Sequence, residues 1–128
     1  MTPDQFSPAF RRIHMELARE PGHPEGDPSD SYVLVAPLLE DGRIDAASWK
    51  EHRTACRVVH RHGGDTDIGH LVHGPGGQWR IHYDIAGDAE DEVGYRLASE
   101  KLVAGEYVSI IRDNDAHPYR VTAVTPLD

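Results

Sequence analysis

The middle of the chain consists of short segments separated by glycine-rich turns, and this pattern constrains the fold more than any other feature. Segments 57–62, 68–73 and 78–85 flank the turns GGDTD (63–67) and GPGG (74–77). Apolar and polar residues alternate most clearly in 78–85, and a period of two indicates a strand with one buried face. Strands joined by short turns pair antiparallel, so this region is expected to form a β-meander.

Segment 78–85 gives the clearest expectation about burial. One face of this strand holds large apolar side chains and the other holds polar ones. The apolar set is expected to be buried, and it comprises Trp79, Ile81 and Tyr83. The polar set is expected to be exposed, and it comprises Gln78, Arg80 and His82. A turn centred on GPGG would place His70 opposite Ile81, so that Ile68, His70 and Val72 share the buried face.

Two helices are expected outside the meander. Residues from about 7 to 19 form an amphipathic pattern, with Ser7 as the cap and an apolar stripe of Phe10, Ile13 and Leu17. Residues 45–56 predict a short internal helix capped by Asp45. Residues 20–31 are expected to be a loop, and its length is a mild hint of function because most connections are shorter.

Together these elements predict a single α+β domain over residues 1–128. Its β-rich body, 32–125, would be a mainly antiparallel, strongly bent sheet or a small, partly open β-barrel. The N-terminal helix would cover one face or the open end of that sheet.

Composition excludes several classes of function. The chain has 13 Lys and Arg against 22 Asp and Glu, a net charge of −9, which argues against binding to nucleic acid or anionic membranes. Cys56 is the single cysteine, so neither an internal disulfide nor a four-cysteine zinc site can form. The sequence shows no apolar segment of membrane-spanning length and no secretory signal, so a cytoplasmic location is expected.

The chain resembles a family of small uncharacterised bacterial proteins with no established function. The resemblance rests on LAREPGHPEGD (17–27), on YVLVAPL with DGRIDAASWKEHR (32–53), on GGQW with YD, and on GEYVSI with YRV. It implies a stand-alone domain and assigns no catalytic residue.

A second likeness concerns VAGEYVSI (103–110), which is similar to the strand that opens flavin-binding reductase barrels. Such barrels also use an Arg-x-Tyr-Ser/Thr segment to hold the flavin, and YRVT (119–122) has a different order. Binding of a flavin or nucleotide in a small barrel is therefore the third hypothesis for function.

Four histidines, His60, His62, His70 and His73, fall within residues 58–73 and raise the question of a metal site. In one register of the 57–73 hairpin, His60, His62 and His70 point to the same face and could ligate zinc. A slip of one residue would turn His60 and His62 to solvent. A turn as long as GGDTD does not choose between these registers.

We expect no tight metal site, and His60, His62 and His70 are the candidates if one exists. Structural zinc takes four protein ligands, and Asp65 and Asp67 are assigned to the turn. His70 is expected to be a hydrogen-bonded core residue, with the other three histidines at the edge or surface.

The leading hypothesis for function is a non-catalytic binding or interaction module. Its partner would be an unidentified protein or small molecule, with no cofactor, no nucleic acid and no membrane. The alternative is a metal-dependent enzyme or metal-binding protein that uses the histidines of the 57–73 hairpin. The sequence identifies no catalytic residue.

Overall fold

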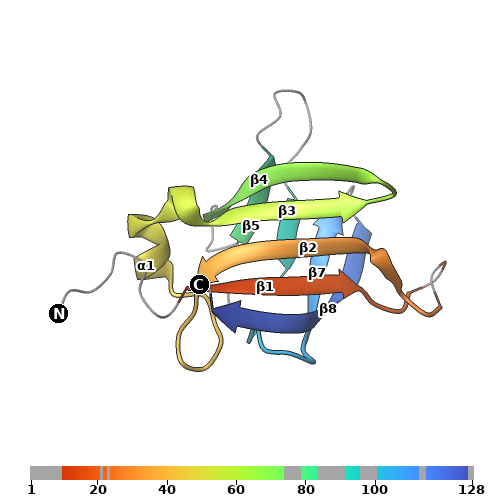
Figure 1. Cartoon of the computed structure of the whole chain (residues 1–128), viewed down its shortest axis with the longest axis horizontal. Coiled ribbons are helices and arrows are strands. Elements are labelled where there is room, and N and C mark those ends of the chain that lie inside the picture. The colour runs from red at the N-terminus through yellow and green to blue at the C-terminus, as the bar shows by residue number, and fades with distance from the viewer. Residues whose placement is uncertain are drawn as a thin grey trace.

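The computed structural model describes residues 10–20, 22, 24–73, 79–83, 92–95, 101–112 and 115–126. Within them, antiparallel strands follow one another around a closed barrel (Figure 1). The strands are β1 (Phe10–Leu17), β2 (Asp27–Pro37), β3 (Arg57–His62), β4 (Asp65–His73), β5 (Trp79–Tyr83), β6 (Glu92–Tyr95), β7 (Tyr107–Arg112) and β8 (Asp115–Pro126).

The barrel closes through β8, which pairs with both β7 and β1. Figure 1 shows β1 lying between β2 and β8. The register runs from Arg11 opposite Pro126 to Leu17 opposite Tyr119, with an irregularity between His14 and Met15. Closure leaves the backbone groups of β1 hydrogen-bonded on both sides, which removes an exposed sheet edge.

The prediction of an N-terminal helix was wrong, and with it the α+β class. Residues 10–17 form β1, the described part of the chain is mainly β-sheet, and residues 7–9 lie outside it. Ile13, Met15 and Leu17 alternate with polar residues and point into the barrel, where each is at most 4% exposed. Phe10, Ile13 and Leu17 are all buried, but they do not share one face of a helix. Ile13 and Leu17 point into the barrel, whereas the Phe10 ring packs edge-on against His52.

One helix lies between β2 and β3. Helix α1 (Ala46–Glu51) begins at Asp45, whose carboxylate accepts hydrogen bonds from the backbone of Ala47 and Ser48, and a 3-10 turn (Arg53–Ala55) follows it. Trp49 anchors this segment, since its indole N–H donates to the Leu71 carbonyl and its ring packs against Trp79. The short internal helix and its Asp45 cap are thus present, and they cover one end of the barrel.

The interior is filled with side chains, as expected for an eight-stranded barrel. Trp79 and Ile81 are buried and His82 is exposed, which confirms that part of the expectation for this strand. Arg80 is half-buried, while Gln78 and the side chain of Tyr83 lie outside what the structure describes.

The predicted pairing of β4 with β5 was wrong by one residue. Leu71, not His70, lies opposite Ile81, so Ile68 and His70 are on the outer face and Ile68 is 40% exposed. The proposed turn, GPGG (74–77), is outside the described residues. The β-rich body also begins earlier than residue 32, because β1 starts at Phe10, and β2 starts at Asp27 within the segment expected to be a loop. None of the described helices has the length and apolar character to cross a membrane.

Replacing Met15 by alanine tests whether β1 is part of the core. Met15 is fully buried between β2 and β8, so Met15→Ala should lower the free energy of unfolding by about 2–5 kcal/mol. Arg12→Ala, at an exposed position of the same strand, should stay within about 0.5 kcal/mol of the parent. Equal, small losses in urea denaturation would show that β1 does not pack in the barrel.

Candidate metal centre

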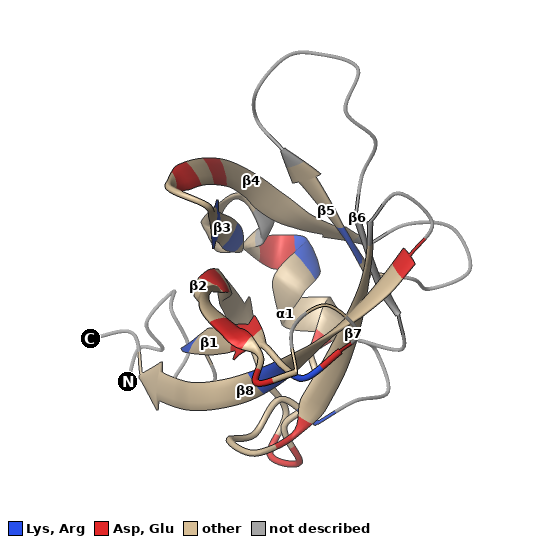
Figure 2. Ribbon diagram, turned by 90° about the vertical axis from the view of Figure 1, so that its right-hand side faces the viewer, with Lys and Arg blue, Asp and Glu red and all other residues tan. Residues whose placement is uncertain are grey.

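Polar side chains line the end of the barrel opposite α1, which we call the mouth. It comprises the end of β3 and the starts of β2, β4 and β8. Figure 1 shows α1 at one end and the β3–β4 turn at the other. Figure 2 looks into the barrel from the side of this turn and shows acidic positions at the start of β4 and in β2.

Asp30 of β2, whose side chain is 15% exposed, joins the buried polar groups of the mouth. Its Oδ1 accepts a hydrogen bond from the Tyr119 hydroxyl (2.8 Å) and lies 2.8 Å from Nε2 of His60. Tyr119 is fully buried and His60 is 2% exposed. Because ionised Asp30 can only accept, Nε2 of His60 carries the proton in this contact, and Nδ1 is then the nitrogen with the lone pair when the ring is neutral.

The His60 ring lies in a stack of three rings. It is parallel to Tyr32, with centroids 4.0 Å apart, and the ring of His62 lies 4.3 Å away with an interplanar angle of 22°. Tyr32 is buried, whereas the His62 side chain is 39% exposed. The stack therefore runs from the apolar core to solvent, and its outer ring is the one with room to turn.

Asp67 of β4 completes the cluster. Its Oδ2 lies 2.9 Å from Nε2 of His62, and one ligand atom from each of His60, His62 and Asp67 lies within 4.8 Å of the others. Two nitrogens and one carboxylate oxygen form a donor set suited to divalent transition metals. Among the described residues, this is the group with the composition and proximity of a metal site.

The β3–β4 register creates this arrangement, and two glycines set it. Gly63 and Gly64 have φ of 56° and 91°, the left-handed values that a two-residue hairpin turn of type I′ requires. His62 therefore pairs with Asp65 and His60 with Asp67. The turn is shorter than the expected GGDTD, so Asp67 is a strand residue whose side chain reaches the mouth.

The structure separates the candidates that the sequence had grouped. His60 and His62 meet in the mouth, while His70 is on the outer wall, where Nε2 lies 3.5 Å from Nη1 of Arg57. The prediction that His70 is a core residue and His60 an edge or surface residue was therefore wrong. His73 ends β4, and its side chain is outside the described part of the chain.

Sequence reasoning missed Asp30 and Tyr119, and assigned Asp67 to a turn. A signal existed for two of them. The period of two that places Tyr32 and Leu34 inside the barrel also places Asp30 there, and Gly-Gly predicts a two-residue turn that makes Asp67 part of the strand. Tyr119 meets Asp30 through barrel closure, because β8 and β2 lie on either side of β1.

A third histidine–carboxylate contact lies near the start of β8. Nδ1 of His117 is 3.0 Å from the Glu20 carboxylate, and both side chains are largely buried. His117 precedes Tyr119 by two residues and therefore lies on the same face of β8. This contact ties the end of the β1 segment to β8 beside the mouth.

Cys56 lies outside the cluster, and its thiol is expected to be unreactive. It is fully buried, its thiol lies 3.6 Å from the His52 carbonyl, and burial raises the pKa of the thiol to about 11. A thiol in this state is neither a ready nucleophile nor a ready metal ligand.

No family model, curated protein or solved structure matches this chain. The resemblance to small bacterial proteins of unknown function stays a prediction, and any function must be argued from the geometry of the site.

Replacing Tyr119 by phenylalanine tests the buried network. The buried hydroxyl donates to the largely buried carboxylate of Asp30, so Tyr119→Phe should lower the free energy of unfolding by about 1.5–3 kcal/mol. Tyr107→Phe makes the same change at a side chain that is 57% exposed and should cost less than about 0.5 kcal/mol. Equal costs in urea denaturation would show that the Asp30 contact adds nothing.

Thiol alkylation tests the environment of Cys56. A rise in pKa from 9.0 to about 11 lowers the thiolate fraction near pH 8 about 100-fold. Iodoacetamide should therefore react at least that much more slowly with the native protein than with the urea-unfolded chain. Comparable rates, followed by intact-mass spectrometry, would contradict the buried placement.

Proposed function

We propose that the protein is a binding module that holds a divalent transition-metal ion in the mouth of its barrel. The observation that carries the proposal is the convergence of His60, His62 and Asp67 at the open end of an apolar barrel. The expectation of no tight site rested on a shortage of ligands. Asp67, paired with His60 across the hairpin, now supplies one of them.

The distances require only a local adjustment. Zinc binds nitrogen and oxygen at about 2.0–2.2 Å, so two ligand atoms on one ion lie at most about 4.2–4.4 Å apart. The atoms here lie within 4.8 Å of one another. Ring lone pairs lie in the ring plane, so His62 must turn out of its stack to coordinate, and its partial exposure permits that movement.

Asp30 and Tyr119 provide the supporting shell. A histidine that ligates a metal usually donates its other ring N–H to a carboxylate, which fixes the tautomer and raises the basicity of the ligand. The His60–Asp30 contact has this form, and the Tyr119 hydroxyl holds the carboxylate in place. His60 would then use Nδ1, and its ring is already held by Tyr32.

The donor set favours zinc, cobalt, nickel or copper over magnesium and calcium, which prefer oxygen alone. Three protein ligands leave at least one coordination position for water or another ligand. The protein is thus a binding module, as expected from the sequence, and its proposed ligand is a divalent transition-metal ion. Cytoplasmic location remains part of the proposal, supported by a lone, reduced cysteine.

Flavin or nucleotide binding stays a prediction that the geometry favours less. Large side chains fill the described interior between α1 and Asp30, among them Tyr32, Trp79 and Tyr119. A flavin would show directly as visible absorbance of the purified protein.

Calorimetric titration of the metal-free protein with Zn²⁺ tests the proposal. We expect saturable binding of one ion and thermal stabilisation that grows with the logarithm of zinc concentration, about 2.7 kcal/mol at 100 times Kd. His62→Ala and Asp67→Asn should each weaken binding by more than the 10–100-fold typical of losing a supporting residue. Both positions are partly exposed, so the fold should survive these changes.

His70→Ala is the matched control, because it removes a histidine from the same hairpin on the outer wall. Its affinity should equal that of the parent. Absence of saturable zinc, nickel, cobalt or copper binding, or equal losses in His70→Ala and His62→Ala, would overturn the proposal.

A further inference from the structure

The two strands of the β3–β4 hairpin each carry a pair of side chains that can ligate a metal, at mirrored positions about the turn. Residues 60–67 read HRHGGDTD, with two histidines at alternate positions before the glycines and two aspartates at alternate positions after them. Three of these four side chains, His60, His62 and Asp67, form the metal cluster. Asp65 is the fourth.

The strand register places Asp65 on the same face of the hairpin as the other three. His62 pairs with Asp65, and His60 pairs with Asp67. Directly opposed residues have Cβ atoms about 4.5–5.5 Å apart, and alternate residues of one strand are about 6.5 Å apart. The four Cβ atoms therefore form a rectangle whose corners lie about 4–4.5 Å from its centre. Aspartate and histidine side chains are long enough to meet above that centre.

The Asp65 side chain can adjust to reach this point. Asp65 is exposed, and within the described residues no hydrogen bond or ion pair involves its carboxylate. It directly follows Gly63 and Gly64, and it lies opposite His62, the histidine that must turn out of its stack to coordinate. The adjustment that the fourth ligand requires is therefore confined to the same end of the hairpin.

Charge balance favours a second carboxylate on the ion. With neutral imidazoles, Asp67 alone would leave a divalent ion with a net positive charge, whereas Asp65 and Asp67 together neutralise it. A neutral set of ligands avoids a net charge beside the apolar interior of the barrel. An external anion added to that set would bring a further negative charge close to Asp30, which already lies 2.8 Å from His60.

We propose that Asp65 is the fourth protein ligand of the metal site, so that two imidazoles and two carboxylates surround the ion and exclude external ligands. The inference rests on the proposed function and fills the coordination position that the other three residues leave. Sites closed by four protein ligands hold an ion, whereas catalytic zinc sites keep a position for water or substrate. A closed site therefore separates a module that holds the ion from a metal-dependent enzyme.

Visible absorption of the Co²⁺ adduct tests the inference, because it reports the ligands of the ion, and azide binds a coordination position that is open to solvent. Azide should leave the spectrum of the parent adduct unchanged. Asp65→Ala should weaken Co²⁺ binding at least about tenfold, and azide should change the spectrum of its adduct saturably. Thr66→Ala, an exposed position on the outer face of the same strand, is the matched control and should behave like the parent.

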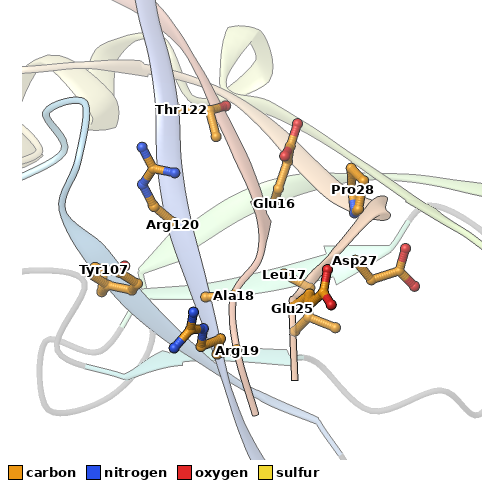
Figure 3. A pocket seen from close by; sticks show the side chains of 10 residues that line it. All are labelled: Glu16, Leu17, Ala18, Arg19, Glu25, Asp27, Pro28, Tyr107, Arg120 and Thr122. Atoms are coloured by element: carbon orange, nitrogen blue, oxygen red, sulfur yellow. The ribbon is translucent and has the colours of Figure 1, made fainter. Parts of the chain in front are cut away.

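The pocket beside β1, β7 and β8 in Figure 3 does not interfere with this measurement. None of the four hairpin residues lines it, so azide bound there would not coordinate the ion. If Asp65→Ala binds Co²⁺ too weakly to titrate, Asp65→His supplies a nitrogen ligand at the same position and should give an adduct that azide does not change.

A change in the parent spectrum with azide overturns the inference, as does an Asp65→His adduct that azide changes. Equal affinity and equal spectra in the parent and Asp65→Ala overturn it as well. These outcomes leave the three-ligand site intact. Failure of the parent to bind Co²⁺, by contrast, would overturn the proposed function together with the inference that rests on it.

Discussion

The pairing of β8 with β1 is the constraint on which the rest of the structure depends. It converts a meander of strands into a closed wall, and a closed wall of this size has an interior that side chains fill. Closure also places Tyr119 of β8 near Asp30 of β2, across β1. Helix α1 covers one end with Trp49, which leaves the mouth as the end where polar interior positions meet solvent.

Removing the polar groups of the mouth from water destabilises the fold, and the hydrogen bonds between these groups offset that loss. A largely buried carboxylate without partners would be destabilising, but Asp30 has a phenol and an imidazole at 2.8 Å. The same contacts fix the His60 ring and its tautomer. A group that stabilises the fold therefore also orients a ligand, and a metal at His60, His62 and Asp67 would use an arrangement that the barrel already maintains.

Local pattern predicted some of this protein well. Alternation placed Trp79 and Ile81 inside, and the Asp45 cap marked the one described helix. The N-terminal segment misled because Phe10, Ile13 and Leu17 recur at helical spacing, while its true partner, β8, lies more than 100 residues away in sequence. Pairing with β8 makes this segment a strand despite its helical spacing of apolar residues, and no pattern within the segment itself indicates that pairing.

Only part of the candidate metal site could be predicted from the sequence, because the rest depends on strand pairing. The density of histidines identified His60 and His62 as candidate ligands. Which residues face them depends on the β3–β4 register, and one extra or missing turn residue would move the side chains of a strand to its other face. Gly63 and Gly64 carry that information, since two adjacent glycines with positive φ make a two-residue turn. Tyr119 could not be found by pattern, because its role arises only when the barrel closes.

The β3–β4 register is the central claim, because it decides whether Asp67 or a neighbour faces the histidines. Nuclear Overhauser contacts between the backbones of the two strands measure it directly in solution. The structure predicts contacts that pair His60 with Asp67 and His62 with Asp65. Contacts that instead pair His60 with Thr66 or Ile68 would show a slipped hairpin, and the metal cluster would then not exist.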